Sequence, residues 1–435
     1  MRWQAQIGCI IYLFQGRQTA NSLPDLIFTY VGGSVFVSLA LYANLCPRSP
    51  VLAFSTPTHV SRRHLAMPSW SSEPNGTMTA AVLTNPGPSP PAQCFSYSTT
   101  YPRPTLPSPE WILCRVHAAG LNRAELRGRA ALPPGRPEFN IFQAEYHEDP
   151  PKILGEEFVG EVEEAGSSTD FKRGEKVTGF IYGGGKAYDG SYAEFTLCHR
   201  RRLYRLPPET SLSWDVVGAI PMSMWTAYGG IMLAGRLRDR GAGTSVLIHG
   251  GTSSVGIWAI LLAKETGATV LATTRNPAKV DHLKRAGVDH VIFEDALEAE
   301  LSRLYPRGVD IILELVGPNQ ILRSLNLTAR YGTVVIEGVL NLQWQADGFS
   351  PVMIPPTRNL SFYTMTNSGI GSEDDEVDSQ TVEAILADVI RKVESGTYPS
   401  EIFLDRTFKL AEIGEAHAYM EDNKAKGKVV VTVLP

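Results

Sequence analysis

The stretch that most constrains the fold is residues 244–256, which read TSVLIHGGTSSVG. Its apolar run ends at the glycine pair Gly250 and Gly251, and a mostly apolar segment begins at Val255. This order predicts a buried strand, a tight turn and the start of a helix. Backbone N–H groups at a helix N-terminus attract anions, and glycines let a pyrophosphate approach the main chain. The turn is therefore a candidate phosphate-binding site.

The sequence after this turn alternates between strands and helices. Apolar strands are expected at residues 268–275, 288–293, 309–316 and 332–339. Residues 277–287 form a predicted helix with proline at its start and glycine at its end. Alternating strands and helices require parallel pairing through right-handed crossovers. We therefore expect an α/β fold with a doubly wound dinucleotide-binding domain, in which Gly250, Gly251, Ser253, Ser254, Val255 and Gly256 contact the cofactor.

The end of the second strand indicates which dinucleotide binds. NAD-specific sites place a carboxylate there, about 20 residues past the turn, for the ribose hydroxyls. This chain has Thr274 and Arg275 instead, followed by Lys279. A hydroxyl, a guanidinium and an ammonium suit a phosphate dianion, although the two cations could simply solvate a helix end. The expected cofactor is NADPH.

Composition excludes several classes of function. The chain of 435 residues is 43% hydrophobic and carries a formal net charge of −5, so nothing suggests nucleic acid as a partner. Its five cysteines are dispersed without any C-x-x-C pair. This pattern fits a reducing compartment and provides no cysteine-rich zinc lobe.

The first 77 residues differ in character from the rest. Residues 1–72 contain five arginines, no lysine and a single acidic residue, Asp25. Residues 26–45 are uncharged and mostly apolar, and 20 residues at about 1.5 Å each just span a ~30 Å hydrocarbon layer. Three interpretations stay open: a leader without ordered structure before Met78, a membrane anchor that leaves the catalytic part in the cytosol, and a mitochondrial presequence.

A group of motifs after Met78 resembles a known family. They are residues 119–125 (AGLNRAE), 154–162 (LGEEFVGEV), 173–177 (RGEKV), 189–194 (DGSYAE) and the turn itself. In this order they resemble the quinone oxidoreductase (ζ-crystallin-like) branch of the medium-chain dehydrogenase/reductase superfamily. The resemblance covers about residues 78–435 and leaves the extension unexplained.

The resemblance implies a bilobal enzyme. We expect a GroES-like β-rich catalytic domain at 78–207, a Rossmann domain at 208–370 and a C-terminal return to the catalytic domain at 371–435. Zinc-dependent relatives carry a cysteine in the loop around Asn122 and a histidine in a Gly-His-Glu motif, where this chain has Gly155-Glu156-Glu157. Because the ligands that zinc prefers are missing, no metal is expected.

The resemblance also implies the reaction and further site residues. The expected chemistry is hydride transfer from NADPH to a quinone or an α,β-unsaturated carbonyl. Asn122 is the first catalytic candidate, as a donor near nicotinamide and substrate, with a loop-capping amide as the alternative. Tyr192, after glycines whose loop could cover the cleft, is a second candidate, with Tyr182 and Tyr188 as alternatives. Relatives carry a tyrosine five residues after the asparagine, where this chain has Arg127.

Further cofactor contacts are implied at Thr226, Gly338 and Asn423, and the middle turn glycine of many relatives is Ser254 here. Two alternative functions stay open: a zinc-type alcohol dehydrogenase of another branch, and a protein that binds NADPH without turnover. The expected partners are a small carbonyl or quinone substrate and a second copy of the chain in a homodimer. The expected location is cytoplasmic, unless the extension anchors the protein or directs it to mitochondria.

Overall fold

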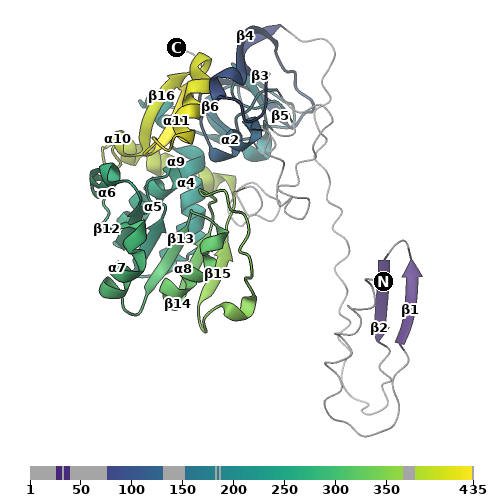
Figure 1. Ribbon diagram of the computed structural model, residues 1–435. Coiled ribbons are helices and arrows are strands. Elements are labelled where there is room, and N and C mark those ends of the chain that lie inside the picture. Colours follow the sequence, from purple (N-terminus) through teal and green to yellow (C-terminus); the bar gives the residue numbers. More distant parts are fainter. Residues whose placement is uncertain are drawn as a thin grey trace. The chain divides into compact units, whose positions relative to one another are not determined.

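The structure is a computed structural model that describes residues 26–31, 34–39, 76–130, 152–181, 184–185, 188–365 and 378–433. The chain divides into two units, residues 1–64 and 65–435. In the first unit, strands β1 (Leu26–Val31) and β2 (Ser34–Leu39) pair antiparallel (Figure 1). The described part of the candidate anchor 26–45 is thus a pair of strands, and the rest of it lies outside the described residues. The membrane anchor stays a prediction.

A search of the described residues for membrane-spanning helices finds one, residues 214–234, by length and composition only. This helical run holds α3 (Trp214–Gly218), α4 (Pro221–Tyr228) and a π-helix, Gly229–Ala234. Its most apolar window is 72% buried against the rest of the chain. Such burial is typical of a core helix that packs inside a folded domain.

The second unit contains a six-stranded parallel sheet. Its strands are β10 (Ser245–His249), β11 (Thr269–Thr274), β12 (His290–Phe293), β13 (Val309–Glu314), β14 (Thr328–Ile336) and β15 (Asn359–Phe362). Their order across the sheet is β12-β11-β10-β13-β14-β15. The order reverses between β10 and β13, and ligands of doubly wound sheets bind at such a switch point.

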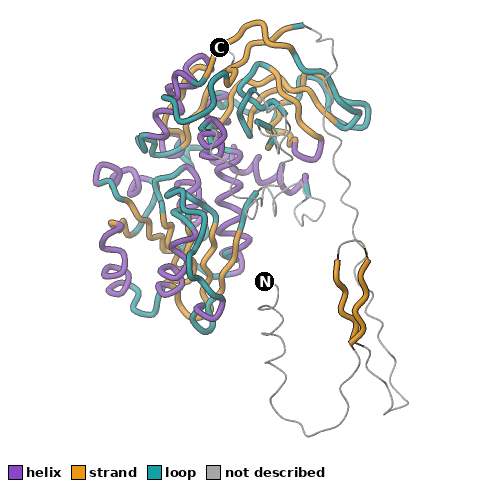
Figure 2. Tube along the Cα trace, turned by 45° about the vertical axis from the view of Figure 1, so that its right-hand side comes forward, coloured by secondary structure: helices purple, strands orange, loops and turns teal. Residues whose placement is uncertain are grey.

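Strand β10 has buried apolar side chains on both of its faces, which is typical of a strand at the centre of a sheet. Val246 and Ile248 join one hydrophobic cluster, whereas Leu247 joins another on the opposite face. Both faces are covered by helices (Figure 2), which is the usual arrangement for a parallel sheet. These helices are α5 (Ser254–Glu265), α6 (Val280–Arg285), α7 (Leu297–Leu304) and α8 (Ile321–Leu327), with α9 (Ser379–Glu394) and α10 (Ser400–Phe403) further along the chain.

The catalytic lobe is built on a mostly antiparallel sheet in the order β16-β17-β5-β6-β7-β9, with β8 also paired to β5. Its strands are β5 (Trp111–Gly120), β6 (Glu157–Ala165), β7 (Lys176–Phe180), β8 (Phe195–His199), β9 (Leu203–Arg205), β16 (Leu404–Lys409) and β17 (Lys428–Thr432). A separate hairpin joins β3 (Thr77–Leu83) to β4 (Phe95–Pro102). Helices α2 (Arg123–Arg129) and α11 (Ile413–Glu421) complete the lobe.

The C-terminal strands β16 and β17 belong to the sheet of this lobe. Strand β17 pairs antiparallel with β5, so that Val430 lies opposite Gly120. Figure 1 shows the yellow elements β16 and α11 beside the blue elements of the catalytic lobe. The fold class predicted from the sequence, a GroES-like lobe with a Rossmann domain, is confirmed.

Candidate functional site

The turn after β10 has a backbone that only small residues allow. Gly250 has φ +98°, in the left-handed region that favours glycine. A Cβ on Gly256 would lie 2.7 Å from Gly250 O, and one on Gly251 would lie 2.7 Å from Ala272 Cβ. The Ser253 hydroxyl caps α5, since it accepts from Gly256 N at 3.1 Å and donates to Gly250 O at 2.9 Å.

The predicted turn residues are brought together as expected. Ser254 is the first residue of α5, and Ser253, Ser254 and Val255 are all partly exposed. The N–H groups at the start of this 12-residue helix therefore lie beside a closely packed glycine turn. This arrangement suits an anion such as a pyrophosphate. Thr273, which was not predicted, supports the turn by accepting from Gly250 N at 3.0 Å.

His249 ends β10 directly before the turn and is fully buried. Its Nδ1 lies 2.6 Å from Glu314 Oε2, and its Nε2 lies 2.9 Å from Glu294. Burial lowers the pKa of His249, but the hydrogen bonds and charges of Glu294 and Glu314 outweigh burial and raise it to about 9. The residue is thus a charged structural histidine that holds the turn onto β13.

The end of β11 carries the residues that were expected to choose the cofactor. Thr274 is buried, and its hydroxyl accepts from Asn276 N at 3.1 Å. Arg275 is exposed. The Lys279 ammonium donates to the backbone oxygens of Asn423, at 3.1 Å, and Ala425, at 2.5 Å. Lys279 therefore already joins the Rossmann lobe to the C-terminal turn.

More cations gather at this place than the sequence indicated. Arg123, the first residue of α2, donates to the Asn423 side chain at 3.0 Å. Burial lowers the pKa of Arg123, and the charge of Arg275 lowers it further. Burial also lowers the pKa of Lys279, where Arg123, Arg275 and Lys426 add to the effect against the opposing charge of Asp405. Like charges that perturb one another favour binding of an anion.

Asn122, the first catalytic candidate, belongs to a buried polar network in the catalytic lobe. Its Oδ1 accepts from Lys428 Nζ at 2.7 Å, and its Nδ2 donates to Glu157 Oε1 at 3.0 Å. Lys428 also donates to Glu157 Oε1, and both side chains are only 1% exposed. Glu157 Oε2 accepts from Met222 N at 3.0 Å, which ties the network to α4. Asn122 is the N-cap residue of α2, and both interpretations of its amide, as a donor to the substrate and as a loop cap, stay predictions.

Glu125, a buried residue of α2, extends this network. Its carboxylate accepts from Asn122 N and, at 3.0 Å, from Glu156 N. Burial raises the pKa of Glu125 to about 8, and the charge of Glu156 adds to the shift. Neither Glu125 nor Lys428 was identified from the sequence. The signal for Glu125 was its spacing from Asn122, an N-cap residue with glutamate three positions later.

Tyr192 does not lie at a cleft surface, which differs from the loop position expected for it. The side chain is fully buried, its ring lies edge-on to His417 at 5.9 Å, and Tyr192 N donates to Leu154 O. Burial and the nearby carboxylate of Glu125 raise the pKa of Tyr192 well above its ordinary value. That Tyr192 donates a proton stays a prediction. Because the side chain is buried, the proton would have to reach the substrate through the core.

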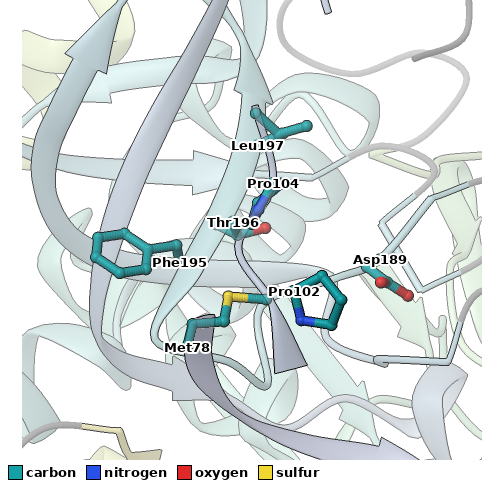
Figure 3. A pocket seen from close by; sticks show the side chains of 7 residues that line it. All are labelled: Met78, Pro102, Pro104, Asp189, Phe195, Thr196 and Leu197. Atoms are coloured by element: carbon teal, nitrogen blue, oxygen red, sulfur yellow. The ribbon is translucent and has the colours of Figure 1, made fainter. Parts of the chain in front are cut away.

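The segment that contains Tyr192 is held by structural contacts. Asp189 accepts from Tyr101 Oη at 2.7 Å and from Ile153 N at 3.0 Å. Figure 3 shows a small pocket beside Asp189 that is lined by Met78, Pro102 and Phe195 among others. None of the predicted site residues lines this pocket. Its location therefore adds nothing to the site around the nucleotide turn.

The three remaining residues that were predicted to contact the cofactor, Thr226, Gly338 and Asn423, all lie in the described part of the chain. The Thr226 hydroxyl donates to Met222 O at 2.7 Å within α4. A Cβ on Gly338 would lie 2.3 Å from Leu315 O, so glycine is required where β14 ends. Asn423, with φ 54°, lies between Arg123 and Lys279. Glu337 was not predicted, and both oxygens of its buried carboxyl lack a hydrogen-bond partner among the described residues.

The catalytic-lobe network does not fit a zinc ion. The oxygen atoms that Asn122 and Glu157 could offer to a metal both accept from the Lys428 ammonium. A cation at the same place would repel a second one. Zinc also prefers cysteine and histidine ligands, which this network lacks.

Comparison with known proteins follows the two lobes. The family described as "Alcohol dehydrogenase GroES-like domain" matches residues 108–208, and "Zinc-binding dehydrogenase" matches residues 254–377. The chain is 30% identical over 284 residues to a phthioceranic/hydroxyphthioceranic acid synthase of Mycobacterium tuberculosis, and it covers 12% of that protein's length with 64% of its own. The curated synthases are thus far longer than the part that this chain matches.

Two shorter proteins match more completely. The mitochondrial NAD(P)H oxidoreductase RTN4IP1 of Danio rerio is 27% identical over 362 residues, which are 76% of this chain and 86% of that protein. The solved structure of the quinone oxidoreductase from Coxiella burnetii has a TM-score of 0.62 at 24% identity, with 82% of this chain and 99% of that chain covered. The solved structure shows that the fold is shared. The two matched domains, which together cover more than half of the chain, show that the chain belongs to the medium-chain dehydrogenase/reductase superfamily.

Proposed function

We propose that this chain is an NADPH-dependent oxidoreductase of the zinc-independent quinone oxidoreductase branch, which transfers hydride to a quinone or an α,β-unsaturated carbonyl. The observation that carries the proposal is the cation cluster at the end of β11. Arg275 follows β11 directly, and Lys279 and Arg123 lie close enough to Arg275 for its charge to lower their pKa values. No carboxylate ends β11, where an NAD-specific enzyme would need one.

The residues present fit a dinucleotide. The turn at Gly250 and the start of α5 would hold the pyrophosphate, because the N–H groups of a helix start favour an anion and Gly256 packs directly against the turn backbone, with no room for a Cβ. The hydroxyl of Ser253 is already committed to capping α5, so backbone N–H groups rather than this side chain would face the anion. Arg275 would hold the 2′-phosphate. When bound, the nicotinamide supplies the hydride.

The catalytic lobe would orient the substrate rather than donate a proton through Asn122. Both polar atoms of the Asn122 amide are engaged by Lys428 and Glu157. An amide held in this way fixes α2 and the loop before it against the network. Because Tyr192 is also buried, the same observations favour a second candidate function, a protein that binds NADPH without turnover.

The test is NADPH oxidation by the purified full chain. Quinones, 2-alkenals and cyclic enones serve as acceptors, with NADH as the alternative cofactor and with or without a chelator. The proposal expects acceptor-dependent oxidation of NADPH that the chelator does not change. Tight NADPH binding without any oxidation would favour the non-catalytic function. Chelator-sensitive oxidation of an alcohol would favour a zinc-type alcohol dehydrogenase and overturn the proposal.

Cofactor choice is tested with Arg275→Ala. A charge-assisted hydrogen bond is worth about 1.5–3 kcal/mol, so NADPH should bind about 10- to 100-fold more weakly while NADH changes little. Arg303, whose partner Glu300 lies one turn earlier on exposed α7, provides the matched control as Arg303→Ala. Equal losses for both cofactors would refute the role of Arg275.

We also propose that the protein forms a homodimer through the free edge of the parallel sheet. Among the described strands, β15 pairs with β14 on one side only. Around this edge Phe362 is 52% exposed, Tyr331 66% and Val352 90%. An edge strand with exposed apolar side chains favours pairing with another strand. A second copy would offer the same edge, and pairing of the two edges would satisfy the backbone hydrogen-bonding groups of both.

We propose a cytoplasmic location for the catalytic part, with a membrane-anchored or mitochondrial protein as the alternatives. The ordered catalytic lobe begins with β3 at Thr77, next to Met78. A fluorescent fusion of the full chain is therefore compared with a fusion that begins at Met78. Identical diffuse distributions support the proposal, whereas membrane or mitochondrial signal that only the full chain shows would overturn it.

A further inference from the structure

The segment that follows β14 runs from the nucleotide turn toward the catalytic lobe. Leu340 lies beside the turn, since a Cβ on Gly250 would be 3.0 Å from Leu340 Cδ1. Leu340 N donates to Leu315 O at 3.1 Å, and Asn341 N donates to Val316 O at 3.0 Å. We call residues 338–344 the strap. Its first half is thus fixed to the Rossmann lobe at the switch point of the sheet.

Side chains fix the second half of the strap. Asn341 Nδ2 donates to Asn319 Oδ1 at 2.7 Å, and Asn319 Nδ2 donates to Gln343 Oε1 at 2.7 Å. Gln343 N in turn donates to Asn341 Oδ1 at 3.0 Å. These bonds leave the strap little freedom up to Gln343. The next residue, Trp344, is therefore presented at a defined place.

Trp344 meets a residue of the other lobe. The Arg127 guanidinium carbon lies 3.9 Å from the centroid of the Trp344 ring, which is a cation–π contact. Arg127 lies on α2, four residues after Arg123, so the two guanidiniums share one face of this helix. Arg123 reaches Asn423 in the cation cluster. The face of α2 that reaches the cation cluster therefore also carries Arg127, which contacts the strap.

We propose that Arg127 and Trp344 are positioning residues that form a clasp between the two lobes, and that the clasp must open before the dinucleotide can leave. The proposal rests on the proposed NADPH function. A cofactor in the turn at Gly250 lies next to the strap, whose far end Arg127 holds to the catalytic lobe. The clasp therefore sets how long NADPH stays bound and keeps the catalytic lobe in register with it.

The test measures NADPH dissociation. Bound NADPH is displaced with excess adenosine 2′,5′-bisphosphate in a stopped-flow instrument, and the decay of NADPH fluorescence gives the rate. Loss of a cation–π contact should raise this rate about 2- to 30-fold in Arg127→Ala and in Trp344→Ala. Because both changes remove one interaction, the double variant should be no faster than the faster single variant. Trp344→Phe, which keeps an aromatic face, should fall between Trp344→Ala and the unchanged chain.

Arg406→Ala is the matched control, since Arg406 stacks on Phe408 and Tyr419 within one lobe. It should leave the dissociation rate unchanged. Unchanged rates in the clasp variants, or rates that multiply in the double variant, would overturn the clasp while the NADPH function stands. A chain that binds no NADPH at all would instead overturn the proposed function and the clasp with it. Circular dichroism and the unfolding midpoint identify a variant that fails to fold, and Trp344→Phe then provides the decisive comparison.

Discussion

Replacement of Lys428 by methionine tests the buried network that holds α2. Lys428 and Glu157 are each 1% exposed, and without the ammonium Glu157 keeps only the N–H donors of Asn122 and Met222. Breaking a buried ion pair by removing one partner costs about 3–5 kcal/mol. The expected loss of unfolding free energy at pH 7 is therefore about 3–5 kcal/mol.

This magnitude should depend on whether the partner Glu157 keeps its charge. The double variant Lys428→Met with Glu157→Gln removes both charges and should recover most of the loss. Urea unfolding of both variants, followed by circular dichroism at pH 7, measures the loss and the recovery. Lys424→Met, which removes a lysine that is 59% exposed, is the control and should cost below about 1 kcal/mol.

The reasoning fails if Lys428→Met loses less than about 1 kcal/mol at pH 7, well under the range for a broken buried pair. It also fails if the double variant is as unstable as the single one, because the loss would then reflect packing of the lysine stem. In either case Asn122 would not be held by charge. Its amide could then turn toward a substrate.

Three further changes probe other parts of the structure. The pKa of His249 in the folded protein, about 9, lies above its ordinary value. The charged histidine therefore stabilises the fold fully below about pH 6.5, and this stabilisation is lost as pH rises through 9. His249→Gln should flatten the resulting fall of the unfolding midpoint, measured from about pH 6 to 10. Gly256→Ala places a Cβ 2.7 Å from Gly250 O and should weaken NADPH binding by tenfold or more, which fluorescence titration measures; retained affinity would contradict the cradle. Phe362→Lys puts a charge at the free sheet edge and should give a monomer in size-exclusion chromatography with light scattering; a dimer that persists would refute an interface at this edge.

The Rossmann domain was predictable because its signals are local. A run of apolar residues ends in a glycine pair, and this order alone specifies a strand, a turn and a helix start. The structure has β10 at Ser245–His249 and α5 from Ser254, close to the expected positions. The predicted boundaries of a helix shift where the residues of a turn determine how the helix begins. The helix expected at 277–287 begins as a 3-10 turn at Pro277–Lys279 and continues as α6 to Arg285.

The network around Asn122 could not be predicted for the opposite reason. Lys428 lies 271 residues from Glu157 in the sequence, and the two come together because β17 and β6 both pair with β5. Likewise, Tyr192 is flanked by glycines that suggest an exposed loop, yet its backbone bonds to Leu154 and places the ring in the core. In both cases a contact between distant segments determines the chemistry of the side chain.

Helix α2 connects these separate observations. Its N-cap, Asn122, is held by the buried Lys428 and Glu157, its first residue, Arg123, reaches the cation cluster, and Arg127 stacks on Trp344 of the strap. A helix of seven residues is too short to be stable alone, so these contacts set its position. Any change that frees Asn122 should therefore also move both guanidiniums. A loss of activity in an Asn122 variant then identifies a missing proton donor only if cofactor affinity and dissociation stay unchanged.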